Sequence, residues 1–89
     1  MALPYAYSKE ASDDMRSLDK TVARRISKKI RFFCSTDDPM RNAKALKGSL
    51  SGVYRFRVGD WRVLFRKTVD GTIILLIILS VKHRNEVYE

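Results

Sequence analysis

The hydrophobic positions of this chain follow a helical spacing in its first part and a strand spacing in its last part. Apolar residues recur every three or four positions in two early series, which comprise Ala11, Met15 and Leu18, and then Val22, Ile26, Ile30 and Phe33. This spacing predicts two amphipathic helices. Ser8 and Asp19 precede the two series and are suitable N-caps. Because little more than Leu18 and Asp19 separates them, we expect an antiparallel helical hairpin.

The last part of the chain has the pattern of β-strands. Val53–Val58 and Trp61–Lys67 are separated only by Gly59-Asp60, a pair typical of a two-residue hairpin turn. A second turn at 69–72 leads to Ile73–Val81, which is apolar from 73 to 79 and therefore expected in the middle of a sheet. A short strand is also expected at Leu3–Tyr7.

The segments between and after these elements have no regular period. Asp37-Asp38-Pro39 ends the second helix, and Met40–Leu50 is interpreted as a connection. The last eight residues are too polar for a strand and are expected to form a tail or one helical turn. The order β-α-α-β-β-β predicts a single α+β domain over residues 1–89. Its sheet would be four-stranded and mostly antiparallel, with the helical hairpin packed on one face.

The alternation of side chains along the strands predicts two different sheet faces. One face should pack against the helices, and it carries Tyr54, Phe56, Trp61, Val63, Phe65, Ile74, Leu76 and Ile78. The other face should be open, basic on one side and apolar on the other, with Arg55, Arg57, Arg62 and Arg66 beside Leu64, Leu75, Ile77 and Leu79. An open face of this composition favours a partner chain.

Composition narrows the class of protein. The formal net charge of +8 is typical of nucleic-acid binders, with a surface charged for solubility as the alternative. Basic residues also cluster on the second helix, and such a run is typical of a solvated helix face unless it forms a binding surface. A single cysteine, Cys34, excludes an internal disulfide and is consistent with a reducing cytosol. We expect its side chain to be buried in the protein core. With no signal peptide and no apolar run long enough to cross a bilayer, we expect a soluble, cytoplasmic protein without a membrane partner.

The residues that could carry chemistry are mainly arginines. One histidine and one cysteine cannot form a metal cluster, so neither a metal site nor a cofactor is expected, and the helix-associated acids are interpreted as caps. If Gly59-Asp60 forms the turn, Arg57 lies directly opposite Arg62, with Arg55 on the same face. Two like charges in this arrangement are destabilising, which indicates that an anion such as phosphate is placed there. Such a set can support metal-free RNA cleavage, in which the neighbouring 2′-hydroxyl attacks the phosphate.

Two motifs resemble the RelE/ParE superfamily of bacterial and archaeal toxins. They are LKG followed by LxGxYRxRVGDxR, between Leu46 and Arg62, and HRxxVY, between His83 and Tyr88. The resemblance covers nearly the whole chain and implies the same fold. It also implies the toxin of a type II toxin–antitoxin module, bound by an acidic antitoxin that contacts operator DNA for both proteins. RelE-type members cleave mRNA on the ribosome, whereas ParE-type members inhibit DNA gyrase.

The resemblance also implies roles for individual residues. Arg62 matches the arginine that stabilises the transition-state phosphate, and Tyr88 matches a tyrosine that helps to activate the 2′-hydroxyl. Arg55 and Arg57 stand where the best-studied type carries lysines, and we expect them to hold the RNA backbone. The general acid stays open among Lys82, Arg84 and His83. The further residues expected to bind RNA or phosphate are Arg66, Lys47 and His83.

Three functions are therefore compared. The first is a ribosome-dependent mRNA endoribonuclease that inhibits translation, which the RelE-like positions favour. The second is a ParE-like gyrase inhibitor without enzymatic activity. The third is an inactive homologue that serves only as a partner of its antitoxin.

Overall fold

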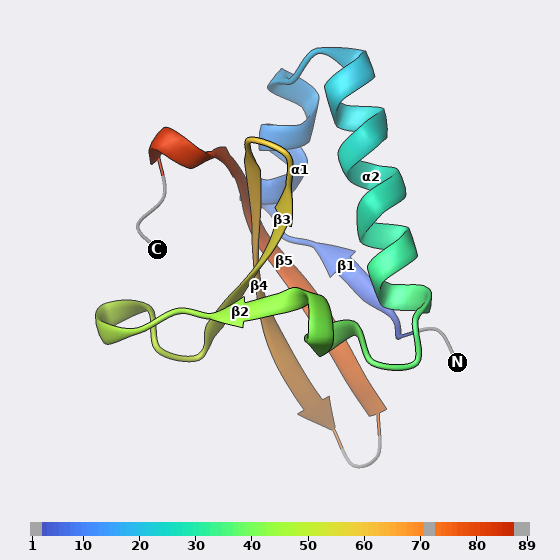
Figure 1. The fold of residues 1–89 in the computed structure, drawn as a ribbon, viewed down its shortest axis with the longest axis vertical. Coiled ribbons are helices and arrows are strands. Elements are labelled where there is room, and N and C mark those ends of the chain that lie inside the picture. The colour runs from blue at the N-terminus through green and yellow to red at the C-terminus, as the bar shows by residue number, and fades with distance from the viewer. Residues whose placement is uncertain (1–2, 71–72, 87–89) are drawn as a thin grey trace.

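The computed structural model describes residues 3–70 and 73–86, with the side chains of residues 70 and 73 left undescribed. Two helices pack on one face of a five-stranded sheet, which is the predicted α+β architecture with one strand more (Figure 1). The helices are α1 (Lys9–Ser17) and α2 (Lys20–Ser35). The strands are β1 (Tyr5–Tyr7), β2 (Ala43–Ala45), β3 (Val53–Val58), β4 (Trp61–Asp70) and β5 (Ile73–His83). Three short 3₁₀ turns are η1 (Pro39–Asn42), η2 (Gly48–Leu50) and η3 (Arg84–Glu86).

The helices begin where the capping residues predict. The Ser8 side chain accepts a hydrogen bond from the Ala11 N–H, and the Asp19 side chain accepts one from the Thr21 N–H. Each bond satisfies a donor that has no partner inside its helix. The two helices turn back on each other between Ser17 and Lys20, as the short separation requires (Figure 1).

The sheet has the strand order β1-β5-β4-β3-β2, with β1 parallel to β5 and the other pairs antiparallel. The predicted hairpin is confirmed, because Val58 pairs with Trp61 and Arg57 pairs with Arg62 across the Gly59-Asp60 turn. The expected count of four strands was wrong. Part of the supposed connection forms β2, in which Lys44 pairs with Arg55.

The core lies between the helices and the predicted sheet face. Phe33 from α2 contacts Phe56 at 4.8 Å between ring centroids, and Phe56 stacks on Phe65 at 4.3 Å. Ile26 and Ile30 of α2 are fully buried in the same cluster. The assignment of the two faces is thereby confirmed for the helix-covered part of the sheet. Ile74 is the exception, because 37% of its surface is exposed near the β4–β5 end that extends beyond the helices (Figure 1).

A β-bulge interrupts β5 and reverses its alternation. Leu64 pairs with Ser80 while Phe65 pairs with Ile78, so Leu79 is the additional residue. As a result Val81, which is 2% exposed, lies in the core, and Lys82 pairs with Arg62 on the open face. Strict alternation from Ile78 would have placed Lys82 toward the helices instead.

Helix α1 continues the edge of the sheet where β1 ends. The Ser8 N–H donates to the Ile78 carbonyl at 2.8 Å, and the Ser8 hydroxyl donates to the Leu79 carbonyl at 2.9 Å. Six residues further along the chain, the Asp14 carboxylate accepts the Val81 N–H at 2.9 Å. The bulged half of β5 therefore pairs with β4 on one edge, and on the other edge it is held by α1 and its N-cap rather than by a strand. No helix in the described part of the chain is both long and apolar enough to cross a membrane.

Candidate nucleic-acid interface

Three cations form a row across adjacent strands on the open face of the sheet. Arg57 on β3 pairs with Arg62 on β4, and Arg62 pairs with Lys82 on β5. Neighbouring strands are about 4.8 Å apart, so the backbone positions of this cationic row span only about 10 Å. The row runs beside the β3–β4 turn, and it combines two residues expected to bind phosphate with one candidate acid.

Arg62 is the most enclosed member of the cationic row, with 4% of its surface exposed. Its Nη1 donates to the Gly59 carbonyl at 2.9 Å and to the Trp61 carbonyl at 3.1 Å. These bonds direct the guanidinium toward the turn, because hydrogen bonds to a charged donor are stronger than those to a neutral one. Arg57, by contrast, is exposed and is the member of the row that a large anion can reach most easily.

Lys82 extends from the row over the edge of the sheet to helix α1. Its Nζ lies 2.9 Å from Asp14 Oδ1 and 3.8 Å from Glu10 Oε2. The hydrogen bond that Lys82 donates to Asp14 is the largest cause of its raised pKa. Burial lowers this pKa, and the negative charges of Asp14, Glu10 and Glu86 raise it further. A lysine with a raised pKa is suited to stabilising negative charge and less suited to donating a proton near neutral pH.

Asp14 is a residue whose role the sequence interpretation assigned wrongly. It was interpreted as a cap, but it lies inside α1 and bonds both the Val81 N–H and the Lys82 ammonium. A signal was available, since Asp14 lies three positions after the buried Ala11 and therefore on the same side of the helix. An acid on the buried side of an amphipathic helix indicates a specific partner.

The C-terminal segment docks on the β3–β4 turn. The Arg84 N–H donates to the Asp60 carbonyl at 2.8 Å, and the Arg84 guanidinium lies 3.7 Å from the Asp60 carboxylate. Arg84 is thus brought to the same end of the sheet as the cationic row. Tyr88, the remaining candidate of this segment, lies outside the described residues.

His83 lies on the other side of the sheet from Arg62. It pairs with Trp61, and their rings meet edge to face with centroids 5.3 Å apart. The ring Nδ1 of His83 accepts the Asn85 backbone N–H at 3.3 Å, and the backbone N–H of His83 donates to Glu86 Oε1 at 3.1 Å. The structure does not bring His83 together with the cationic row.

The other predicted phosphate-binding residues extend toward the opposite end of the hairpin. Arg55 is half-buried between Lys44 and Leu64 in the next row of the open face. Arg66 is four residues from Arg62 along β4, or about 13 Å, and Lys47 is exposed immediately before η2. These residues extend the basic surface but do not join the row at the turn.

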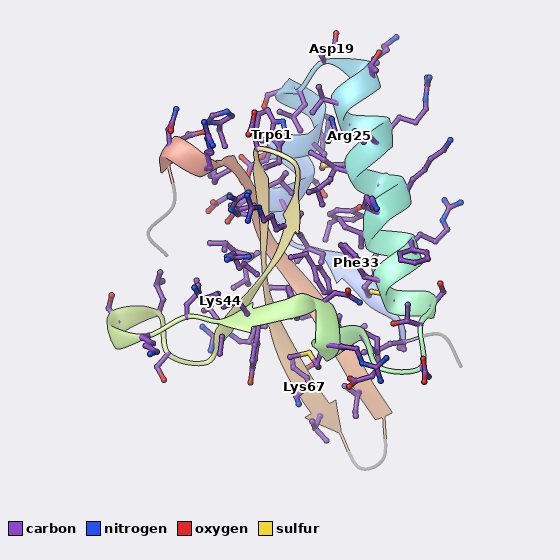
Figure 2. The ribbon with its side chains drawn as sticks, viewed as in Figure 1. Asp19, Arg25, Phe33, Lys44, Trp61 and Lys67 are labelled. Atoms are coloured by element: carbon purple, nitrogen blue, oxygen red, sulfur yellow. The ribbon has the colours of Figure 1, made fainter. Side chains whose placement is uncertain are left out.

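Arg25 is a further basic residue at this turn that sequence reasoning did not place there. A side-chain carbon built on Gly59 would lie 2.5 Å from Arg25 Nη2, so the guanidinium packs directly against the turn. Figure 2 shows Arg25 on α2 near Trp61, which begins β4. Helix α2 therefore supports the turn whose carbonyl holds Arg62.

Among the described residues, no group of three His, Cys, Asp or Glu side chains is arranged to hold a metal ion. The arrangement at the turn offers fixed positive charge and many N–H donors in one short row. Such a surface can bind a phosphate and stabilise charge that develops on it during a reaction.

Comparison with known families gives one match. The family model described as the ParE toxin of the type II toxin–antitoxin system parDE matches residues 5–88. Comparison with curated protein sequences gives no significant match.

Several solved structures share the fold. A chain of the RelBE2 toxin–antitoxin complex from Mycobacterium tuberculosis is 25% identical with a TM-score of 0.77, covering 94% of this chain and 100% of that one. A chain of the archaeal RelE–RelB complex from Pyrococcus horikoshii is 24% identical with a TM-score of 0.67, covering 98% and 100%. The YoeB/ParE toxin from Agrobacterium tumefaciens is 18% identical with a TM-score of 0.64, covering 91% and 98%.

Proposed function

This chain belongs to the RelE/ParE superfamily of toxins of type II toxin–antitoxin systems, and from that premise we propose that it is a ribosome-dependent mRNA endoribonuclease of the cytoplasm. The observation that carries the proposal is the cationic row Arg57–Arg62–Lys82 beside the β3–β4 turn. Three cations aligned within about 10 Å can neutralise the charge that develops on a phosphate under nucleophilic attack.

The proposed reaction uses the RNA's own 2′-hydroxyl as nucleophile. Its oxygen attacks the adjacent phosphorus and loses a proton, and the bond to the 5′-oxygen of the next nucleotide breaks as that oxygen gains a proton. The products are a 5′-hydroxyl fragment and a fragment ending in a 2′,3′-cyclic phosphate, which becomes a 3′ phosphate only if a water molecule then hydrolyses the bond to the 2′-oxygen. The enzyme must align the hydroxyl, neutralise the phosphorane and assist both proton transfers.

We assign these tasks to residues of the row and the C-terminal segment. Arg57 and Arg55 hold the RNA backbone, and Arg62 stabilises the phosphorane after it turns from the carbonyls of Gly59 and Trp61. Tyr88 orients or deprotonates the 2′-hydroxyl. The raised pKa of Lys82 supports a role in stabilising charge near the leaving oxygen, rather than service as a general acid.

The supporting residues follow from the same surface. Arg66 and Lys47 extend the RNA-binding face away from the turn, and Arg84 contributes charge beside it. A proton donor for the 5′-oxygen is then Arg84 or a water molecule, with His83 facing Trp61 and remote from the row. Arginine is a weak acid and water is a weaker one, so neither donor transfers a proton efficiently near neutral pH.

A second function is favoured by two findings. The matching family model is described as ParE, and the most enclosed member of the row, Arg62, is directed toward carbonyls in the described conformation. A ParE-like protein would inhibit DNA gyrase and catalyse nothing. It would cause DNA damage and filamentation without cleavage of mRNA.

We further propose an acidic antitoxin as the partner of this chain. The similar structures from M. tuberculosis and P. horikoshii are toxin–antitoxin complexes, and the net charge of +8 favours an acidic protein. Such an antitoxin would cover the basic open face and would connect the toxin to operator DNA. Mixing the two chains and measuring loss of toxicity tests this assignment.

The deciding experiment expresses the chain briefly in cells and maps the 5′ ends of mRNA. Cuts within translated codons that disappear when translation is blocked are expected. Arg62→Lys and Tyr88→Phe should abolish the cuts, and Arg16→Ala, a change to an exposed cation on α1, should not. Intact mRNA with arrested growth would support gyrase inhibition, and intact mRNA with normal growth would leave an inactive partner of the antitoxin.

A further inference from the structure

A shallow groove of about 540 Å³ lies on the solvent-facing side of helix α2. It is lined by Thr21, Arg24, Arg25, Lys28, Lys29 and Phe32. This groove, called here the α2 groove, is separate from the open face of the sheet because α2 packs against the opposite, helix-covered face (Figure 2).

The charge of the α2 groove has no explanation in the stability of the helix. Arg24–Lys28 and Arg25–Lys29 are like-charge pairs four residues apart, and each such pair destabilises a helix by about 0.2–0.5 kcal/mol. Helix α2 contains no Asp or Glu at all, whereas α1 contains Glu10 and two aspartates. None of the four groove cations takes part in a salt bridge within the described part of the chain. This concentration of charge indicates an external anion.

Phe32 provides a flat apolar surface at the end of the same groove. Its side chain is 56% exposed, which is unusual for a large aromatic residue in a protein with an available core. Lys29 Nζ lies 5.6 Å from the centre of the Phe32 ring, so a cation borders the ring. Cations that track a backbone beside an exposed aromatic ring are the recurring design of single-stranded nucleic-acid sites.

Arg25 connects the α2 groove to the cationic row. Its guanidinium packs against Gly59, and the Gly59 carbonyl accepts a hydrogen bond from Arg62 Nη1. The basic surface therefore runs from the sheet, around the β3–β4 turn and onto α2. A continuous path of this kind fits a long, flexible polyanion better than it fits two unrelated ligands.

We propose that the α2 groove is a second binding site for single-stranded RNA, which begins at the β3–β4 turn and leads away from the scissile phosphate. Arg24, Arg25, Lys28 and Lys29 bind successive phosphates, and Phe32 stacks on one base. An acidic protein segment would match the charge, but it would leave the exposed ring and the connection to the row without a role. The inference rests on RNA as the target in the proposed function, and it adds a surface that holds RNA without cleaving it.

The test measures binding of a fluorescently labelled 2′-O-methyl RNA of twelve nucleotides, which cannot be cleaved because it has no free 2′-hydroxyl. Arg24→Ala/Lys28→Ala should weaken binding by about a hundredfold, since each of the two lost charged contacts is worth roughly a factor of ten. It should also reduce the slope of log affinity against log salt by about 1.4, or roughly 0.7 for each cation removed. Phe32→Ala should weaken binding about fivefold or more, and Phe32→Trp should preserve it.

The matched control is Lys9→Ala/Arg16→Ala on α1. It also removes two positive charges, here from exposed side chains that pair with Asp13. It should change the RNA affinity and the salt slope much less than the groove variant does. Equal effects of the two double variants would overturn the proposal, because they would show dependence on net charge alone. Unchanged RNA binding, with loss of binding to a glutamate-rich peptide only in the groove variant, would also overturn it and identify a protein-binding surface.

Failure of the α2 groove proposal can be distinguished from failure of the proposed nuclease activity. If the groove variant loses RNA affinity while the unmodified chain leaves mRNA intact in cells, the α2 groove stands and the nuclease assignment falls. If mRNA is cleaved but the groove variant binds RNA like the unmodified chain, the groove assignment falls alone.

Discussion

Asp14 fastens α1 to the bulged half of β5, and its removal provides a sharp test of how the candidate site is held. The Asp14 side chain is 15% exposed and accepts the Val81 N–H and the Lys82 ammonium, each at 2.9 Å. Asp14→Ala leaves the N–H of the buried Val81 without its partner, which costs about 1–3 kcal/mol. Alanine is the better helix former by up to about 0.7 kcal/mol, which offsets part of this cost. The lost contact with the Lys82 ammonium adds about 0–1 kcal/mol. The central values of the three terms give an expected net loss of about 2 kcal/mol, in the range of about 1.5–2.5 kcal/mol.

Asp13→Ala is the matched control, because it makes the same change one position earlier on the same helix. The Asp13 side chain is 51% exposed, and within the described residues it pairs only with Lys9 and Arg16, which are themselves highly exposed. Surface pairs of this kind contribute about 0–1 kcal/mol. The better helix propensity of alanine then makes Asp13→Ala nearly neutral.

The assay is urea unfolding, followed by the fluorescence of Trp61 and checked by circular dichroism. The loss of about 1.5–2.5 kcal/mol expected for Asp14→Ala should lower the melting temperature by about 6–20 °C, at roughly 4–8 °C per kcal/mol for a domain of this size. Asp14→Asn should fall between the parent and Asp14→Ala, because its amide oxygen can still accept the Val81 N–H while its amide nitrogen opposes Lys82. If Asp13→Ala and Asp14→Ala lose equal stability, Asp14 does not hold β5 as argued.

Three further changes test other contacts. Gly59→Ala should lower the free energy of unfolding by about 1–2 kcal/mol because its φ is +59°, and by a further amount because the new methyl group collides with Arg25. Adding Arg25→Ala to the same variant should recover the loss caused by the collision, as measured by urea titration. Ser8→Ala removes both a cap and the bond to the Leu79 carbonyl, so it should lower the free energy of unfolding by about 1–2 kcal/mol; a thermal melt unchanged from the parent would contradict this. Burial raises the pKa of the Cys34 thiol from 9.0 to about 11. The Cys34 thiol therefore stays protonated to a higher pH in the folded state than in the unfolded state. As pH rises from 9 to 11, the free energy of unfolding should fall by up to about 1.4 kcal/mol per pH unit. Cys34→Ala should show a shallower pH slope than the parent, and an identical slope would be evidence against this cause.

The sequence was sufficient to predict most local structure, because short-range chemistry determines it. Ser8 and Asp19 can satisfy free N–H groups only at the start of a helix, and Gly59-Asp60 closes a hairpin with little choice of register. Once that register is fixed, Arg57 must lie opposite Arg62, and the aromatic side chains must lie on the other face. The family could also be identified, because its motifs follow this same hairpin.

Other features depended on contacts between residues far apart in the chain. The three residues of β2 have no alternating pattern of their own, and they form a strand because β3 offers them an unpaired edge. The bulge at Leu79 arises between β4 and β5, and it alone places Lys82 in the cationic row. Asp14 bonds to residues 67 and 68 positions away, so no local pattern specifies its partners. The sequence thus determined which charged residues the hairpin carries, and the tertiary structure determined which of them meet, because that depends on how α1, α2 and β5 pack around the turn.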